Sequence, residues 1–220
     1  DYLKEKNLLE NTMIVFASDN GSYRQASNGT LKAVKSYLYE GGIRVPGIIS
    51  WPKLKRKNVV INQAAGFVDI MPTICDILQI SPFKADELDG TSLLGLLENE
   101  KFMRNNPLFW FFYRTSPEIA VRKDDLMIIG KDNDTLPRTH RFSAPDMEYI
   151  KTMNLVDYEL YDLTTDVGQT ENIIEHHPDA KILKSLINEK LVKIQENGPR
   201  WKKLPDATGP KKIKTEWVKY

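Results

Sequence analysis

The fold of the first half of this chain can be predicted from one segment, Met13-Ile14-Val15-Phe16-Ala17-Ser18-Asp19-Asn20-Gly21. It opens with a short apolar run rich in branched and aromatic side chains, and the run stops at Asp19-Asn20-Gly21. A continuous apolar run that ends in a turn signal is typical of a strand buried on both faces, as in a parallel sheet. We therefore predict a buried parallel strand over 13–18, and a strand paired only with antiparallel neighbours would contradict this architecture.

Helices and a further strand are predicted around this segment. A second apolar run from Val45 to Trp51 contains Pro46, which places it near a loop or a sheet edge. Asp69 to Thr73 opens a helix, because proline is tolerated in the first turn and apolar residues follow at helical spacing. Leucines over 93–97 predict a short helix. The first half thus has an α/β pattern.

The pattern changes near Leu108, where we place a domain boundary. Aromatic and branched residues predict antiparallel strands, and a helical pattern follows over 179–195. The predicted strands cover 107–113, 119–122, 126–129 and 158–163, with a hairpin between the second and third. Residues 131–154 show no clear period and are predicted to form a long surface loop.

The predicted fold class is therefore α/β. Residues 1–108 should form a partial mixed or parallel sheet with helices, and residues 109–220 a small antiparallel α+β subdomain with a closing helix and a basic tail. A sheet that is incomplete in this chain should expose an apolar edge or face, so the isolated chain should aggregate or recruit its other half.

Composition excludes several classes of partner. The formal net charge is only +1, so the molecule as a whole has no field that would gather nucleic acid. No apolar run approaches the ~20 residues that a membrane span requires. Cys75 is the only cysteine, which excludes an internal disulfide framework and a cysteine-based metal cluster within these residues.

Asp19 and Asn20 are candidate metal ligands. In an open α/β sheet, ligands gather at the carboxyl ends of strands, and this pair follows such a strand directly. A carboxylate and an amide oxygen suit Ca²⁺ or Mg²⁺. The same Asp-Asn-Gly sequence is also ordinary turn chemistry, and these residues alone leave both interpretations open.

Several further motifs follow in order along the chain. They are Ser18 to Gly21, Leu31 to Pro46 with its Glu40-Gly41-Gly42-Ile43-Arg44-Val45-Pro46, Ile48 to Pro52, Val68 to Thr73, Leu88 to Gly90, Ala120 to Arg122 and Glu159 to Asn172. From about Asn7 to about Pro178, with gaps, the chain resembles the carboxy-terminal part of type I, formylglycine-dependent sulfatases of the alkaline-phosphatase superfamily. We expect it to be a fragment of a larger protein.

The resemblance implies roles for individual residues. Asp19 and Asn20 match the pair that binds the divalent cation, usually Ca²⁺. Lys35 matches the catalytic lysine that contacts the substrate sulfate and supports departure of the ester oxygen. Lys32 is the weaker match, because the family pattern has Arg there. Sulfatases commonly place two glycines before the catalytic lysine, whereas this chain has Ala33-Val34. The resemblance therefore does not determine the conformation of this loop.

Other parts of the sulfatase site fall outside these residues. The resemblance implies a formylglycine nucleophile, a first Asp pair and an active-site histidine in the missing amino-terminal half, so this chain alone should be inactive. Arg44 is either an anion contact or the partner of a structural ion pair with Glu40. His140 and Arg138 are candidate contacts to the substrate, because they lie together in the predicted loop.

The function implied is that of a sulfuric ester hydrolase, acting on a sulfated glycan or an aryl sulfate. The family resemblance implies export to a periplasmic, extracellular or lysosomal compartment. Two alternatives stay open: hydrolysis of phosphodiesters or phosphonate esters by the same superfamily, and a noncatalytic sulfatase-like binding module. We expect Asp19, Asn20 and Lys35 to share one cleft, and we expect the fragment alone to bind Ca²⁺ weakly or not at all.

Overall fold

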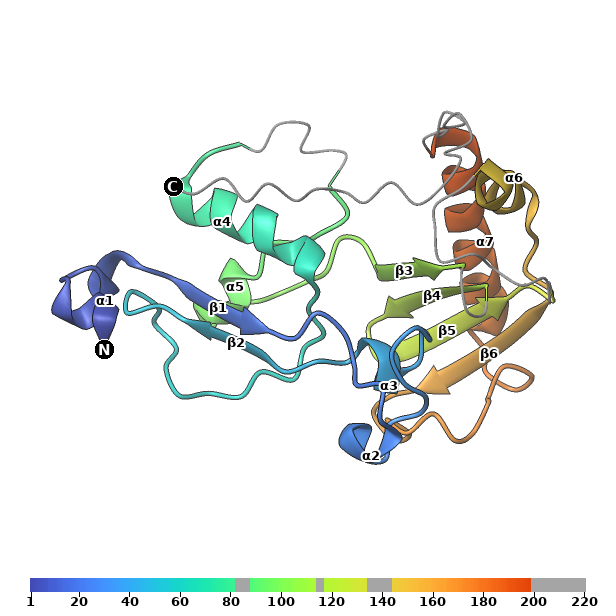
Figure 1. The fold of residues 1–220 in the computed structure, drawn as a ribbon, viewed down its shortest axis with the longest axis horizontal. Helices are drawn as coiled ribbons and strands as arrows, with labels where there is room; N and C mark the ends of the chain where they lie inside the picture. The colour runs from blue at the N-terminus through green and yellow to red at the C-terminus, as the bar shows by residue number, and fades with distance from the viewer. Residues whose placement is uncertain (82–87, 114–116, 134–143, 199–220) are drawn as a thin grey trace, which may run out of the picture.

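The computed structural model describes residues 1–81, 88–113, 117–133 and 144–198. Two sheets lie at opposite ends of the molecule (Figure 1). In chain order the elements are α1 (Tyr2–Glu5), η1 (Leu9–Asn11), β1 (Ile14–Ala17), α2 (Gln25–Asn28), α3 (Glu40–Ile43), β2 (Gly47–Ser50), η2 (Phe67–Asp69), α4 (Ile70–Leu78), α5 (Leu94–Leu97), β3 (Leu108–Phe112), β4 (Glu118–Lys123), β5 (Leu126–Lys131), α6 (Ala144–Thr152), β6 (Asp157–Asp162) and α7 (Ala180–Asn197).

The predicted parallel pairing of the first strand is wrong. β1 pairs with β2 in antiparallel register, with Ile14 opposite Ser50 and Ala17 opposite Gly47, and the described residues contain no parallel pair. A parallel pair would need a crossover that packs back on the same sheet. Here the connection over 18–46 leaves this sheet and packs partly on the other one, so β2 returns in the opposite direction. The mixed α/β class itself is confirmed, since strands and helices alternate along the first half.

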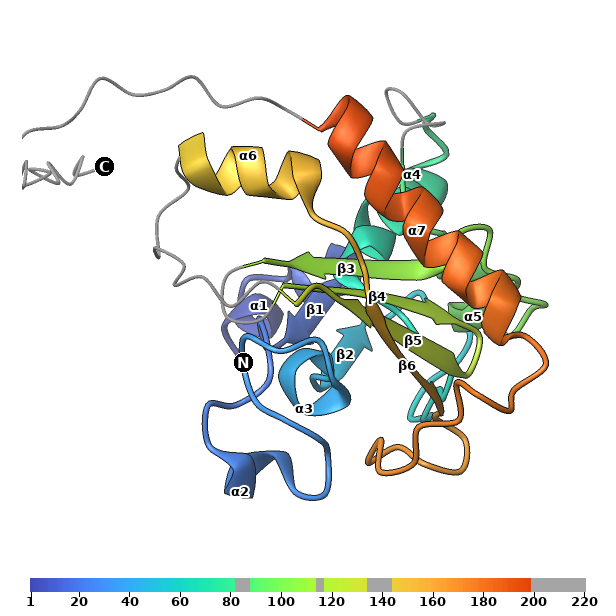
Figure 2. The same cartoon turned by 90° about the vertical axis from the view of Figure 1, so that its right-hand side faces the viewer.

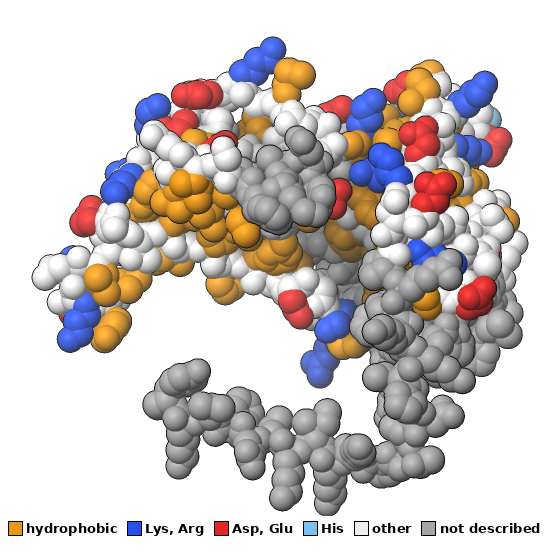
Figure 3. Space-filling view, turned by 90° about the horizontal axis from the view of Figure 1, so that it is seen from above, with side chains coloured by type: hydrophobic (Ala, Val, Ile, Leu, Met, Phe, Trp, Pro, Cys, Tyr) orange, Lys and Arg blue, Asp and Glu red, His pale blue; other side chains and the backbone are white. Residues whose placement is uncertain are grey.

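β1 is also not buried, which corrects the second part of that prediction. Phe16 on β1 and Ile48 on β2 are more than half exposed, as are Met71 and Leu78 on α4. Apolar side chains gather in a broad patch on the side of the molecule that carries α4 (Figure 3). The expected exposure of apolar surface around this sheet is therefore confirmed, while the incompleteness of the sheet stays a prediction.

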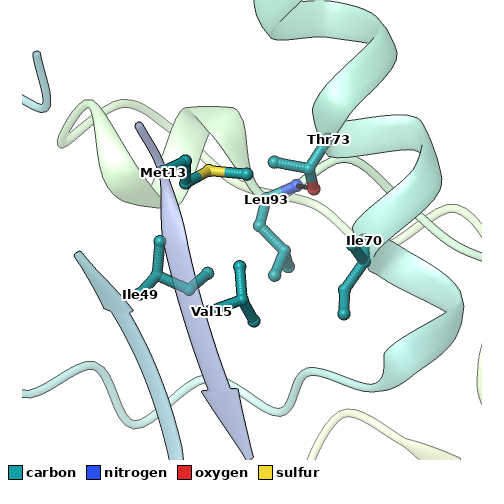
Figure 4. A pocket seen from close by; sticks show the side chains of 6 residues that line it. All are labelled: Met13, Val15, Ile49, Ile70, Thr73 and Leu93. Atoms are coloured by element: carbon teal, nitrogen blue, oxygen red, sulfur yellow. Dashed lines mark hydrogen bonds between the residues drawn. The ribbon is translucent and has the colours of Figure 1, made fainter. Parts of the chain in front are cut away.

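Beneath that patch, α4 and α5 pack over β1 and β2. Side chains from β1, β2 and α4, and from the residues just before β1 and α5, converge on a small apolar cavity lined by Met13, Val15, Ile49, Ile70, Thr73 and Leu93 (Figure 4). The predicted helices over 69–78 and 93–97 are confirmed, with a short 3-10 turn preceding α4. Pro72 lies in the first turn of α4, where its missing N–H costs nothing.

A buried ion pair holds this layer together. Asp69 is fully buried and accepts two hydrogen bonds from the guanidinium of Arg104, at 2.7 and 2.8 Å. Its carboxylate also accepts the backbone N–H groups of Gly66 and Thr91. A Cβ at Gly90 would lie 1.9 Å from the Val68 carbonyl oxygen, so the Leu-Asp-Gly motif packs directly on the Val-Asp motif.

The second sheet confirms the antiparallel prediction. β3, β4, β5 and β6 pair in that order, each antiparallel to its neighbour, and β4 and β5 form the predicted hairpin. α7 lies across the sheet and confirms the predicted 179–195 helix, beginning one residue later and ending two residues later. Figure 2 shows α7 and α6 on one side of this sheet and α3 on the other.

Both faces of this sheet carry an apolar core. On the α7 face, Ile119, Ile128 and Leu160 pack against Leu183 and Ile187. On the opposite face, Ala120, Met127, Ile129 and Tyr161 pack against Leu38 and Tyr39. The segment between β1 and β2 is therefore built into the second sheet, across the predicted boundary at Leu108.

The predicted loop over 131–154 contains a helix, α6, and this is a further correction. The segment has a weak apolar pattern, and tertiary contacts stabilise the helix instead. The Lys151 ammonium donates to the carbonyl oxygens of Ile194 and Gly198 at the carboxyl end of α7, where a cation is favoured. Arg138 and His140 lie outside the described residues. No helix among the described residues is long and apolar enough to cross a bilayer.

Candidate functional site

The Asp19-Asn20-Gly21 turn follows β1 and packs against Gly41 and Gly42 of the short helix α3. The Gly21 N–H donates to the Gly42 carbonyl oxygen at 2.8 Å. A Cβ at Gly21 would lie 1.9 Å from the Gly41 carbonyl oxygen, so only glycine fits at this contact. The Ser18 hydroxyl donates to the Asn20 carbonyl oxygen and closes the turn. The local sequence thus fixes the backbone that carries both candidate ligands.

The side chain of Asn20 has an unsatisfied acceptor. Its Oδ1 is buried and has no hydrogen-bond partner among the residues that the structure describes, whereas the neighbouring Asp19 is exposed. A buried acceptor left unpaired costs roughly 1–3 kcal/mol, so such an atom in a native structure calls for a bound ion or water. An orphaned amide oxygen beside a carboxylate fits a Ca²⁺ or Mg²⁺ ligand.

The pair supplies only part of a coordination shell. Ca²⁺ takes six to eight oxygen ligands. Within the residues that the structure describes, no group of three or more His, Cys, Asp or Glu side chains could hold a metal ion. Further ligands would have to come from elsewhere, and the metal assignment of Asp19 and Asn20 stays a prediction.

The backbone of Lys35 contacts the segment that directly follows the Asp-Asn-Gly turn. Its N–H donates to the Ser22 carbonyl oxygen at 3.0 Å, next to the Asp-Asn-Gly turn. Its ammonium lies 5.0 Å from the centre of the Tyr23 ring. No carboxylate in the described part of the chain lies within ion-pair distance of this ammonium. The three predicted site residues are thus on adjoining turns, while a shared cleft for their side chains stays a prediction.

The turn that carries Lys35 keeps a glycine-like shape without glycine. Ala33 and Ser36, on either side of Lys35, have φ angles of 64° and 78°. For residues with a Cβ the left-handed region costs roughly 1–2 kcal/mol. Asn28 holds this turn, because its amide donates to the Ala33 and Ser22 carbonyl oxygens. The Ala33-Val34 departure therefore coexists with a backbone conformation that glycine favours.

Lys32 is engaged elsewhere. Its ammonium donates to the Tyr161 hydroxyl at 2.8 Å and lies 4.4 Å from the centre of the Tyr39 ring. The Glu159 carboxylate is 3.7 Å away. These contacts attach Lys32 to the second sheet, which favours Lys35 as the lysine available to a ligand.

Glu159 is the charged centre of that attachment. Its carboxylate accepts hydrogen bonds from the Tyr39 hydroxyl (2.6 Å), the Tyr161 hydroxyl (2.7 Å) and the Lys131 ammonium (2.6 Å). Burial alone would raise the pKa of Glu159, but these hydrogen bonds outweigh it and lower the pKa to about 2. Burial and the Glu159 carboxylate raise the pKa of both tyrosines above the ordinary value. Glu159 is therefore ionised and both tyrosines are neutral across the physiological pH range.

Glu40 ties the Glu-Gly-Gly turn to the second half of the chain. The Arg44 guanidinium donates to its carboxylate at 2.8 Å, which shows the structural ion pair that was one of two roles expected for Arg44. Arg122 lies 3.9 Å from the other oxygen. The fully buried Gln169 accepts the Glu40 N–H at 2.7 Å, and Glu118 accepts the Leu38 N–H.

These second-half residues were missed as parts of the site by sequence reasoning. A usable signal was present for two of them. Glu159 and Tyr161 alternate along one strand and so must share a face of the sheet. For Glu118 and Gln169 the sequence carries no comparable signal, because their partners are backbone N–H groups about 80 and 129 positions away.

Comparison with known proteins agrees with this fold. Residues 1–80 match the family model described as sulfatase. The chain is 30% identical over 191 residues to a sulfatase of Formosa agariphila, an alignment that covers 82% of this chain and 32% of that protein. It is 30% identical over 201 residues to human arylsulfatase A, covering 86% of this chain and 39% of the relative.

Solved structures show the same fold. The structure of Ps i-CgsB in complex with k-i-k-neocarrahexaose superimposes with a TM-score of 0.67 at 23% identity, over 90% of this chain and 39% of that one. BT4656 in complex with D-glucosamine-2-N,6-O-disulfate gives a TM-score of 0.60, over 92% and 38%. The chain thus has the fold of part of a sulfatase, and its resemblance to the sulfatase family is confirmed. It spans about a third to two fifths of the length of the first curated relatives that it matches.

Proposed function

We propose that this chain is the carboxy-terminal part of a sulfuric ester hydrolase that cleaves sulfate esters of a sulfated glycan or an aryl sulfate. Its relatives include an arylsulfatase. Solved structures of the same fold carry a neocarrahexaose and a disulfated glucosamine. These names describe those proteins, and they support a sulfated sugar as the first substrate class to test here.

The observation that carries the proposal is that a buried amide oxygen without a hydrogen-bond partner and a lysine without an acidic partner lie on adjoining turns. Asn20 Oδ1 is buried without a partner, and Lys35 lies on the adjoining turn with no carboxylate beside it in the described residues. In the isolated chain the unpaired Asn20 oxygen is destabilising, and the Lys35 ammonium has no acidic partner among the described residues. A bound divalent cation would contact the oxygen, and a bound sulfate ester would contact the ammonium.

The chemistry of sulfate-ester cleavage explains this arrangement. Negative charge grows on the leaving oxygen and on the sulfuryl oxygens as the S–O bond breaks. A positioned ammonium at Lys35 stabilises that charge more in the transition state than in the ground state. Asp19 and Asn20 would hold a Ca²⁺ or Mg²⁺ ion, which supplies electrostatic stabilisation without proton transfer when it is bound.

The rest of the site belongs to residues outside this chain. We propose that a formylglycine nucleophile, the remaining metal ligands and an active-site histidine lie in an amino-terminal part of the same protein. That part is then the principal partner of this chain, and the isolated chain has no turnover. Arg138 and His140 remain proposed contacts to the substrate, and export to a periplasmic, extracellular or lysosomal compartment remains part of the proposal.

The decisive test is Lys35→Ala in the full-length protein, assayed on an aryl sulfate. Loss of a cation aimed at developing charge should lower kcat/KM on the order of 10²- to 10³-fold. Lys181→Ala on α7 is the matched control, because Lys181 is exposed and far along the chain from the site. Thermal melts of both variants exclude unfolding.

Three outcomes would contradict the proposal. A Lys35→Ala variant as active as the parent would remove Lys35 from the site. A parent protein that cleaves phosphonate esters or phosphodiesters and leaves sulfate esters intact would indicate the other chemistry of the superfamily. A parent that binds sulfated glycans without any turnover would indicate a noncatalytic module.

A further inference from the structure

Glu159 joins the segment that carries Lys35 to the second sheet. Four polar groups surround its carboxylate, which is mostly buried: the hydroxyls of Tyr39 and Tyr161 and the ammonium groups of Lys131 and Lys32. Tyr161 and Lys131 belong to the sheet itself. Lys32 and Tyr39 belong to the segment between β1 and β2, so the carboxylate bridges two parts of the molecule.

The two bridged residues stand on either side of Lys35. Lys32 precedes Lys35 by three positions and Tyr39 follows it by four. Between them, Ala33 and Ser36 adopt the left-handed backbone conformation that disfavours residues with a Cβ. A turn of this kind persists only where the surrounding structure over-determines it. Anchors on both sides of the turn meet that requirement.

The charges around Tyr39 show why the anchor needs a carboxylate. The ammonium groups of Lys32 and Lys131 lie 4.4 and 5.3 Å from the centre of the same Tyr39 ring. Two like charges that contact one ring and one carboxylate repel each other in a partly buried setting. The negative charge of Glu159 lies against both of them. Without the carboxylate, this repulsion favours movement of Lys32 away from the cluster, and the turn loses one of its two anchors.

We propose that Glu159 is a positioning residue for Lys35, which it influences by fixing Lys32 and Tyr39 and so holding the strained turn between them. The proposal deepens the proposed function and rests on it, because it gives Lys35 a role at the substrate. It differs from a purely structural role of Glu159, which would stabilise the turn and the sheet to the same extent.

Hydrogen exchange in the full-length protein tests the positioning without any assay of activity. Glu159→Gln keeps the size of the side chain and removes its charge, and Glu175→Gln makes the same change at an exposed position. In Glu159→Gln the amides of Lys35 and Gly41, which are bonded to Ser22 and Lys32, should exchange at least tenfold faster. The amides of β4 and β5 should lose less protection than those of the turn, and Glu175→Gln should match the parent throughout.

Two exchange results would overturn the proposal. Unchanged protection at Lys35 and Gly41 would mean that the turn does not depend on Glu159. Faster exchange by one common factor across the turn and the sheet would mean that Glu159 stabilises the fold as a whole.

Steady-state kinetics on an aryl sulfate then connects the turn to catalysis. A displaced Lys35 should lower kcat about tenfold while KM stays within twofold, because the loss falls in the transition state. A tenfold loss corresponds to about 1.4 kcal/mol. Unchanged kcat with a loosened turn would overturn the link to Lys35. If the parent protein cleaves no sulfate ester, the proposed function fails, and the exchange measurement still decides whether Glu159 holds the turn.

Discussion

The two ends of this molecule are stabilised in different ways. Around β3–β6, both faces of the sheet are covered, and side chains such as Ile128 and Leu160 are fully buried. Around β1, β2 and α4, large apolar side chains stay exposed, and the most deeply buried polar contact is the pair of Asp69 and Arg104. One end is therefore held by an apolar core and the other depends heavily on a single charged pair. The candidate site lies on the segment that joins them.

The largest expected effect is at the end formed by β1, β2 and α4, which we call the open end. Asp69→Ala leaves the Arg104 guanidinium buried without its partner and frees the N–H groups of Gly66 and Thr91. Breaking a buried ion pair from one side costs about 3–5 kcal/mol. Asp76→Ala, at an exposed position of α4, should cost less than about 1 kcal/mol. Chemical denaturation of both variants measures the difference, and equal midpoints would remove the charged pair as the support of this end.

At the other end, formed by β3–β6 and α7 and called the closed end, Ile187→Ala should destabilise the fold by about 2–5 kcal/mol. Ile187 is fully buried in the core between α7 and the sheet, so truncation leaves a cavity. Val192→Ala on the same helix should cost much less, because nearly half of that side chain is exposed. A similar loss from both variants would show that the two sides of α7 are equally packed and would weaken the contrast between the ends.

Glu159, which joins the two ends, should make the stability of the protein depend on pH. The pKa of Glu159 falls from an ordinary 4.5 to about 2 in the folded protein. A lowered carboxyl pKa contributes stability that is complete above pH 4.5 and disappears as the pH falls towards 2. Unfolding measured from pH 6 to pH 2 should therefore show a shallower loss of stability in Glu159→Gln than in the parent, and parallel curves would contradict the assignment.

The smallest expected effect is a gain. Ala33→Gly removes a Cβ from a left-handed backbone position and should stabilise the protein by about 1 kcal/mol or less, because the greater freedom of glycine in the unfolded chain offsets part of the relief. Ala180→Gly at the start of α7 should instead lower stability. Thermal melts compare the two, and a destabilising Ala33→Gly would mean that the turn has a different shape.

Sequence reasoning predicted the closed end better than the open end, for a physical reason. The strands over 107–129 and the helix over 179–195 pack against each other within one stretch of chain, so their alternation and helical spacing record the actual burial. The apolar run over 13–18 records a requirement for burial that this chain does not meet, and it carries no information on strand direction. α6 was missed because contacts with α7 stabilise it more than its own pattern does.

The site was predictable to the extent that it is local. Asp19, Asn20 and Lys35 were identified from neighbouring motifs, and the structure places their turns side by side. The roles of Gln169 and Glu118 depend on long-range contacts with residues 32–40, which no local pattern records. The metal and catalytic roles themselves remain predictions that the proposed experiments test.

The long excursion between β1 and β2 also bears on how the protein folds. The bonds from Lys32 to Tyr161 and from Tyr39 to Glu159 close loops of 129 and 120 residues. Loop-closure entropy must be overcome before such contacts stabilise anything, and pairings of high sequence separation form slowly. The Lys35 turn is therefore expected to order only after the four-stranded sheet exists. During synthesis, residues 31–43 would leave the ribosome long before β6, and would wait for it without a partner.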